Sequence, residues 1–485
     1  MLLLFASGSA RILRMLAVCL IVAAAMSAAA TGQTPAVYDL VIVNGRVIDP
    51  ASGLDAVRSI GVNGSTIQVV SEQPLTGRAR IDAAGLVVAP GFIDLHQHAQ
   101  RGITPAVDRL KVMDGVTTAF ELEVGSDDID AWYAARMGKS ILNYGVSIGH
   151  IPSRMAVMKD PAAFLPSGPA ARRAATEGEI ADISARISQG LDRGAVAVGF
   201  GIAYTPGAER GELLAAFKAA ANAGASAHVH IRGGSAVAAA NEAITIATEA
   251  GAALHIVHVQ SSGGADTAKV LEIIDAARKR GVDVTTEMYP YIAGQTRIES
   301  AVFDNWEMYP DSRFQTLLWP ATGERLTRES FARYRKTGGP VIIFSNTEEV
   351  VRAAAKHPLT MIASDGGGTA HPRTAGTYSR VLGLYVRDEK VLPLAEAVKK
   401  MTIMPAQRLE KRTPMMSHKG RLQPGTDADI VVFDAQRVAD RSTFEQPATP
   451  SEGMVHVLVQ GVAVVRDGRL VENVTPGKAV RAPMR

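Results

Sequence analysis

The stretch Pro90-Gly-Phe-Ile-Asp-Leu-His96-Gln97-His98 decides how the middle of this chain is interpreted. An apolar run leads into two histidines that are two residues apart, and on a β-strand such residues point to the same side. Both imidazoles can therefore reach one point at the carboxyl end of the strand. Imidazole is the most common protein ligand for zinc-type ions, so the pair predicts a metal site rather than two ordinary polar residues.

Three later positions repeat this arrangement of an apolar strand that ends in a polar side chain. His230 and His258 each end such a run and precede glycine-rich sequence, and Asp365 comes directly before three glycines. The carboxyl ends of barrel strands are where enzymes of that architecture build their sites. Four histidines and one carboxylate at successive strand ends therefore predict a shared site. His228 and His255, which lie deeper or face away, are interpreted as structural.

The region 91–415 alternates short apolar strands with alanine-rich helical stretches. Strands that alternate with helices indicate βαβ units and a parallel sheet. About eight such units fit into this region, which favours a (β/α)8 TIM-type barrel over an open sheet. We expect an insertion around 295–340.

Both ends of the chain are rich in strands instead. Residues 38–90 and 416–485 show the alternation of half-buried strands, and turns such as Asn44-Gly45 and Asn63-Gly64 are typical of hairpins. Two strand-rich ends that flank one barrel predict a single small β-sandwich assembled from both termini.

Charge and leader sequence narrow the function class. The net charge is +3, and two of these charges, Arg11 and Arg14, lie in the first thirty residues, which leaves +1 for the rest. A nucleic-acid-binding protein is expected to carry a large excess of basic residues, which this chain lacks. The charge therefore favours a protein that acts on small molecules. The arginines precede an apolar run and then small residues, which predicts a signal peptide over 1–30 and a periplasmic or secreted protein with no membrane anchor after cleavage. The single cysteine, Cys19, lies inside this segment, so the mature chain has no thiolate to offer.

Longer motifs identify the family that this chain resembles. They run almost throughout the chain and include Ala89-Pro-Gly-Phe-Ile-Asp-Leu-His-Gln-His98, Gly115-Val-Thr-Thr118, Gly201-Ile-Ala-Tyr-Thr-Pro-Gly207, Tyr289-Pro-Tyr-Ile-Ala293, His371-Pro-Arg373 and Ala428-Asp-Ile-Val-Val-Phe-Asp434. With these motifs the chain is similar to the amidohydrolase superfamily and, within it, to the D-aminoacylases, the N-acyl-D-amino-acid deacylases.

The resemblance implies a role for each strand-end residue. It implies that His96, His98 and Asp365 form one metal position and that His230 and His258 form a second. It also implies that Asp365 takes the proton from the attacking water and passes it to the leaving amine. The implied cofactor is Zn2+, one or two ions per chain, with Mn2+ or Co2+ as alternatives.

The chain departs from the D-aminoacylase pattern at the shared ligand. D-aminoacylases use a cysteine after Gly-Val-Thr-Thr, which the mature chain cannot supply, and no lysine stands at the strand ends where other members carry a carboxylated one. The corresponding strand holds Glu121 and Glu123 on one face. Because Glu123 is nearer the strand end, we predict that it is the shared metal ligand, with Glu121 as the alternative.

A second departure concerns the substrate. D-aminoacylases present a lysine two residues after the last histidine ligand, and Gln260 occupies that position here. The substrate-binding residues that the resemblance implies, together with this position and the nearby cations, are Arg373, Tyr291, Tyr204, His150, Gln260, Arg232 and Arg297. Arginine suits a substrate carboxylate because its planar fork donates two parallel hydrogen bonds.

We therefore expect an enzyme that hydrolyses a carbon–nitrogen amide bond other than a peptide bond, with an N-acyl-(D-)amino acid as the small-molecule substrate. Two alternatives remain open at this point. One is a dipeptidase or cyclic amidase on the same metal core, and the other is a catalytically inactive binding protein with this fold.

Overall fold

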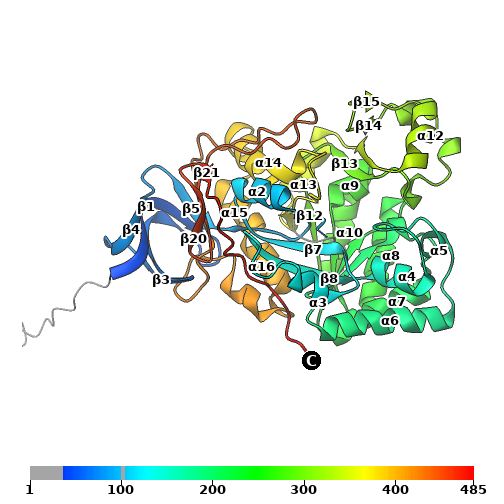
Figure 1. Ribbon diagram of the computed structural model, residues 1–485, viewed down its shortest axis with the longest axis horizontal. Helices are drawn as coiled ribbons and strands as arrows, with labels where there is room; N and C mark the ends of the chain where they lie inside the picture. Colours follow the sequence, from blue (N-terminus) through cyan, green and yellow to red (C-terminus); the bar gives the residue numbers. More distant parts are fainter. Residues whose placement is uncertain (1–36, 100–103) are drawn as a thin grey trace, which may run out of the picture.

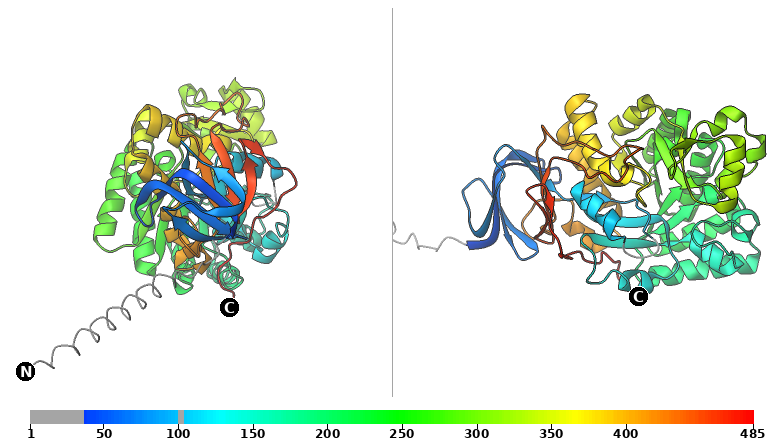
Figure 2. Two further views of the ribbon diagram at one scale, coloured as in Figure 1. Left: turned by 90° about the vertical axis from the view of Figure 1, so that its left-hand side faces the viewer. Right: turned by 45° about the horizontal axis from the view of Figure 1, so that its top comes forward.

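The structure is a computed structural model that describes residues 37–99 and 104–485. The predicted signal peptide lies outside the described residues. No helix of the described part is long and apolar enough to span a membrane. A barrel forms the body of the molecule, a small sheet domain lies at one end, and an insertion lies at the other (Figures 1 and 2).

Eight parallel strands form the barrel, and neighbours in sequence are neighbours in the sheet. They are β6 (Phe92–Asp94), β7 (Val116–Ser126), β8 (Asn143–Gly149), β9 (Val198–Gly201), β10 (Ser226–His230), β11 (Ala253–Ile256), β12 (Val284–Met288) and β17 (Thr360–Ile362). The first and last strands meet where Gln97 pairs with Gly366 in a single parallel bridge. This seam places the ends of β6 and β17 side by side, and with them His96 and Asp365.

A buried ion pair holds the same seam. The Lys111 ammonium donates to Asp94 Oδ2 and, at 2.8 Å, to Ser364 Oγ, and Asp94 Oδ1 accepts from the backbone N–H of Ser364 at 2.9 Å. The side chains of Lys111 and Asp94 are 1% and 0% exposed. Asp94 lies two residues before His96, and Ser364 lies directly before Asp365. This network therefore fixes the backbone next to His96 and Asp365.

Helices surround the barrel and follow the strands in alternation (Figure 1). They are α2 (Pro105–Met113), α3 (Ile129–Ala134), α4 (His150–Met158), α5 (Pro169–Arg172), α6 (Glu177–Asp192), α7 (Arg210–Asn222), α8 (Ala236–Ala250), α9 (Val259–Gly263), α10 (Thr267–Lys279), α13 (Glu348–Lys356), α14 (Arg373–Arg380), α15 (Leu394–Met401) and α16 (Ile403–Glu410), with a π-helix at Val381–Asp388. Helix α8 shows why the sequence folds this way. Ser235 caps its first turn, Gly251 ends it with a left-handed φ of 68°, and small alanines let it pack closely against the strands.

The two ends of the chain build one continuous nine-stranded sheet. Its strands are β1 (Val37–Asp49), β2 (Leu54–Asn63), β3 (Thr66–Ser71), β4 (Thr76–Asp82), β5 (Val87–Pro90), β18 (Ile430–Phe433), β19 (Met454–Val459), β20 (Val462–Arg466) and β21 (Arg469–Leu470). The terminal halves join where β5 pairs antiparallel with β18. The sheet curls until Thr66 pairs with Asp427, and it encloses a core of its own. The predicted barrel with a small β domain from both termini is confirmed.

The insertion is a second small sheet between β12 and β17. Its antiparallel strands are β13 (Ala293–Arg297), β14 (Leu317–Trp319), β15 (Glu324–Arg325) and β16 (Pro340–Phe344), with helices α11 (Asp311–Phe314) and α12 (Arg328–Thr337). An aromatic core that includes Phe303, Phe314 and Phe331 holds it together. The insertion contributes one wall of the cavity described below.

Candidate metal centre

Four side chains from three strand ends converge on one point. His96 Nε2 lies 2.8 Å from Glu123 Oε2 and 3.5 Å from Asp365 Oδ1. His98 Nε2 lies 3.0 Å from Asp365 Oδ1 and 3.4 Å from Glu123 Oε2. One ligand atom from each of the four residues lies within 4.8 Å of every other, the spacing expected around one metal ion.

Glu123 also belongs to a second group with His230 and His258. Its other oxygen, Oε1, lies 2.8 Å from His230 Nδ1, and the rings of His230 and His258 are 4.5 Å apart between centroids. One carboxylate therefore faces two groups of ligand atoms, one through each oxygen. A carboxylate can bridge two cations in this way.

The chemistry of these groups fits a divalent metal. Burial raises the pKa of Glu123, but hydrogen bonds with His230 and His96 outweigh burial and hold the pKa well below its usual value. Burial lowers the pKa of His258 to about 3, with His230 adding to the effect, so this imidazole is neutral and its lone pair is available. Imidazoles that converge with carboxylates in this way are the donor set of zinc-type sites.

The neighbouring glutamate on the same strand lies beside His98, with Oε1 3.7 Å from His98 Nδ1, and its oxygens also accept backbone hydrogen bonds. Glu121 Oε2 accepts a 2.6 Å hydrogen bond from the backbone N–H of Ala99, and Oε1 accepts one from Gly125 at 3.2 Å. Glu121 belongs to neither group of candidate ligands among the described residues. The structure thus brings together all six side chains predicted as metal ligands and favours Glu123 over Glu121.

Asp365 joins this centre to an arginine. Arg373 Nη1 lies 2.7 Å from Asp365 Oδ2, and the guanidinium carbon lies 4.7 Å from the centroid of the Tyr289 ring. Burial raises the pKa of Asp365, but Arg373 and His96 outweigh burial and hold the pKa below its usual value. Asp365 and His258 also have positive φ angles, 50° and 34°. Such strain in non-glycine residues is typical of functional sites.

A cavity of about 800 Å³ opens beside this centre. Its lining includes His98, Glu123, Tyr204, His230, Arg232, His258, Tyr289, Arg313, Asp365 and Arg373. A volume of this size is typical of small-molecule sites. Tyr204 also lines an adjoining cavity of about 730 Å³ together with Arg297 and Phe164. The site is therefore continuous with room for an acyl chain or an amino-acid side chain.

The predicted substrate-binding residues divide into two sets. Arg373 and Tyr204 line the main cavity, and the Tyr204 hydroxyl accepts a 3.0 Å hydrogen bond from Thr296. Arg232 lines it too, but its guanidinium is occupied by the Glu242 carboxylate and two backbone carbonyls. Arg232 therefore already pairs with a carboxylate in this conformation, and its role as a cation near the substrate stays a prediction.

Three other predicted residues line neither cavity in the part of the chain that the structure describes. His150 Nε2 pairs with Glu212 at 2.7 Å. Gln260 Nε2 donates to the backbone carbonyl of Tyr289 at 2.9 Å. The Tyr291 hydroxyl faces Asp440 at 3.5 Å. Each side chain makes a hydrogen bond within the protein, and the expectation that it contacts substrate stays a prediction.

The structure also reveals residues that sequence reasoning missed. Glu287 Oε1 lies 2.6 Å from His96 Nδ1, and Tyr289 and Arg313 line the cavity. Glu287 follows Thr285 by two residues on β12, so both point to the same side of the strand. A glutamate on the inward face of a barrel strand could have been noticed by this alternation.

Comparison with known proteins assigns the chain to a family. Residues 87–471 match the Amidohydrolase family, and the chain belongs to that family. The N-acyl-D-glutamate deacylase of Alcaligenes xylosoxydans xylosoxydans is 33% identical to it, over 88% of this chain and 93% of that protein. The D-aminoacylase of the same organism is 30% identical, over 88% of this chain and 94% of that protein. These matches confirm the resemblance stated above.

A solved structure agrees in fold along nearly the whole chain. The N-acyl-D-glutamate deacylase from Bordetella bronchiseptica, complexed with zinc and a phosphonate inhibitor that mimics the tetrahedral intermediate, superimposes with a TM-score of 0.78. It is 29% identical, and the match covers 92% of this chain and all of that one.

Proposed function

We propose that this protein is a metal-dependent hydrolase that removes the acyl group from N-acyl-D-amino acids. The observation that carries the proposal is the position of Glu123 between two groups of histidine and carboxylate ligands, beside the Asp365–Arg373 pair at the edge of a cavity. Relatives with this fold are deacylases of N-acyl-D-amino acids, and one of them is described in complex with zinc.

The metal and Asp365 would have different roles in hydrolysis. When bound, a divalent cation supplies Lewis-acid polarisation of the scissile carbonyl and lowers the pKa of water. Asp365 accepts the proton of the attacking water and returns it to the leaving amine. Its Oδ1 faces the ligand group and its Oδ2 faces Arg373, so the carboxylate is held in one orientation for both transfers.

Arg373 and Tyr204 are the residues that we assign to substrate recognition. Both line the cavity, and Arg373 presents a guanidinium that can meet the carboxylate of an amino-acid product. Zinc is the metal that we propose, because a set of imidazoles and carboxylates suits it. We also propose that the protein is exported, because Arg11, Arg14 and the apolar run after them have the pattern of a signal peptide.

A cation on the insertion points to a preference among substrates. Arg313 lines the main cavity, and its side chain makes no hydrogen bond or ion pair with any described residue. By contrast, Asp304 on the same wall is paired with Arg172 and Arg335. We propose that Arg313 receives an acidic substrate side chain, so that N-acyl-D-glutamate or N-acyl-D-aspartate is preferred over neutral substrates.

One panel of substrates tests these proposals. Purified protein loaded with zinc is assayed against N-acetyl-D-glutamate, N-acetyl-D-leucine, N-acetyl-L-glutamate, a dipeptide and a cyclic amide. The proposed function requires acetate release from the D-compounds, and turnover only of the dipeptide or the cyclic amide would replace it. Arg313→Ala should lower the ratio of kcat/KM for N-acetyl-D-glutamate to that for N-acetyl-D-leucine by at least tenfold, and an unchanged ratio would remove Arg313 from recognition.

A further inference from the structure

A chain of hydrogen bonds, buried over its first part, runs from the metal centre through the barrel interior to its opposite end. It begins at His96 Nδ1, which lies 2.6 Å from Glu287 Oε1, and continues from Glu287 Oε2 to His255 Nε2 at 3.2 Å. His255 Nδ1 then lies 2.8 Å from Thr285 Oγ1. The side chains of His96, Glu287 and His255 are each no more than 1% exposed.

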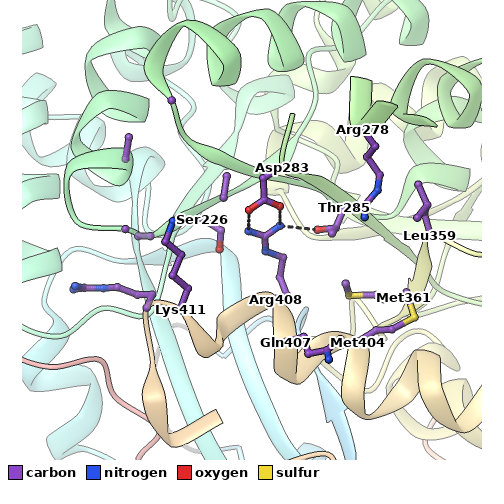
Figure 3. Close-up of a pocket in the computed structure, with 16 residues that line it drawn as sticks. Ser226, Arg278, Asp283, Thr285, Leu359, Met361, Met404, Gln407, Arg408 and Lys411 are labelled. Carbon is purple, nitrogen blue, oxygen red and sulfur yellow. Dashed lines mark hydrogen bonds and ion pairs between the residues drawn. The ribbon is translucent and has the colours of Figure 1, made fainter. Parts of the chain in front are cut away.

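The chain ends in a separate pocket of about 270 Å³ at the amino ends of the barrel strands. There Arg408 Nη1 donates to Thr285 Oγ1 at 3.4 Å and to Asp283 Oδ1 at 2.7 Å. Figure 3 shows the Arg408 guanidinium joined to both residues. The far end of the chain is thus anchored by a guanidinium that can only donate hydrogen bonds.

The acceptor at the near end directs the bonds along this chain. The ionised carboxylate of Glu287 only accepts, so His255 Nε2–H donates to it. In a neutral ring Nδ1 then accepts from the Thr285 hydroxyl, whose other acceptor, the Leu254 carbonyl, is farther away at 3.5 Å. Burial lowers the pKa of His255, which agrees with a neutral ring in this role.

The same reasoning orients His96. Because Glu287 Oε1 accepts, His96 Nδ1 is the nitrogen that donates to it, and Nε2 is the nitrogen that faces the point where Glu123 and Asp365 converge. A histidine ligand whose second nitrogen donates to a carboxylate is more basic and has a fixed ring orientation.

We infer that Glu287 is a positioning residue that holds the His96 ring with Nε2 toward the metal position, and that His255 and Thr285 orient Glu287 from the far side of the barrel. This inference rests on the proposed function for its metal. It adds that metal affinity depends on hydroxyl and imidazole groups that lie toward the opposite end of the barrel and are in neither ligand group.

Zinc affinity of the stripped protein, measured by competition with a fluorescent chelator, tests the inference without any substrate. Glu287→Gln keeps the size of the side chain but turns one acceptor into a donor, so it should weaken zinc binding by about 10–100-fold. Glu287→Asp is shorter but keeps two carboxylate oxygens that only accept hydrogen bonds, and it should retain tighter binding than Glu287→Gln. A role in packing alone predicts the opposite order, because glutamine has nearly the shape of glutamate.

Two variants at the far end form a matched pair. Thr285→Val removes the hydroxyl that bonds His255, and it should weaken zinc binding several-fold. Ser226→Ala removes a hydroxyl 3.1 Å from His228, a buried ring 4.7 Å from that of His255 but outside the chain, and it should change affinity by less than twofold. Each variant is first checked for native circular dichroism, and if Glu287→Gln does not fold, Thr285→Val against Ser226→Ala decides the matter.

The results separate this inference from the proposed function. If Glu287→Gln binds zinc within twofold of the unchanged protein, or better than Glu287→Asp, the inference is overturned whatever the substrate. If no N-acyl-D-amino acid is hydrolysed but zinc affinity follows the expected order, the proposed function fails and the positioning role stands.

Discussion

Glu123 offers the sharpest test of the metal centre, because the two ligand groups share it. With Glu123, the groups contain four and three candidate ligands, and without it they contain three and two. Catalytic zinc sites keep three protein ligands, so the group of His230 and His258 falls below that number while the other does not. Glu123→Gln should therefore reduce the zinc content from two ions to at most one.

The loss in activity follows from the same count. Removing one cation and the shared negative charge costs several kcal/mol of charge stabilisation in the transition state, which corresponds to a fall in kcat/KM of about 10²–10³-fold. Elemental analysis gives the metal content, and acetate release from N-acetyl-D-glutamate gives the rate.

Glu121→Gln is the matched control on the same strand. It makes the same change in charge, and its amide oxygen can still accept from the backbone N–H of Ala99 or Gly125. It should retain more metal and more activity than Glu123→Gln, because Glu121 lies beside His98 but in neither ligand group among the described residues. Full zinc and full activity in Glu123→Gln, or loss of metal only in Glu121→Gln, would refute the assignment of the shared ligand.

Three further outcomes are expected. Arg373→Ala should lower kcat/KM for N-acyl-D-amino acids by an amount equivalent to roughly 2–5 kcal/mol of transition-state stabilisation, because it removes one member of a desolvated charge pair. The decrease should be smaller for the corresponding amides. Equal decreases would mean that Arg373 acts only through Asp365. Saturating zinc, at about 1,000 times its Kd, should raise the free energy of unfolding of chelator-stripped protein by about 4 kcal/mol in a thermal melt, and no shift would contradict a site formed only in the folded state. Lys111→Met should destabilise the protein by roughly 3–5 kcal/mol in urea, because it leaves the Asp94 carboxylate buried without a partner, and Lys111→Met combined with Asp94→Asn should recover part of that loss.

The barrel and the convergence of the ligands could be predicted because both depend on local rules. Alternation along a strand places His96 and His98 on one side, and the parallel order of strands brings their carboxyl ends to one mouth of the barrel. Both features can be predicted from the residues of each strand and from the order of the strands. Neither prediction requires knowledge of which side chains contact one another across the barrel.

The remaining features depend on contacts between distant parts of the chain. His150 follows β8 directly, as a site residue does, yet it pairs with Glu212 on α7. The family motif marked the position of Gln260. It did not show that the Gln260 amide donates a hydrogen bond to the Tyr289 carbonyl. Glu287 escaped notice because its partner His96 is far away in sequence. Family motifs mark positions, whereas the direction of each side chain is decided by its packing.

Because β5 pairs with β18, the small sheet domain cannot be completed until a ribosome has made almost the whole chain. The final residues then run back along the barrel, where Tyr144 exchanges backbone hydrogen bonds with Lys478 and Val480, and the Tyr133 hydroxyl donates to the carbonyl of Val480. Contacts between such distant segments form slowly, and strands that are still unpaired are prone to aggregate. Strands β1 to β4 pair with neighbours that are made at about the same time, whereas one edge of β5 stays unpaired until β18 is made. A chain interrupted before β18 would therefore leave that edge of β5 exposed.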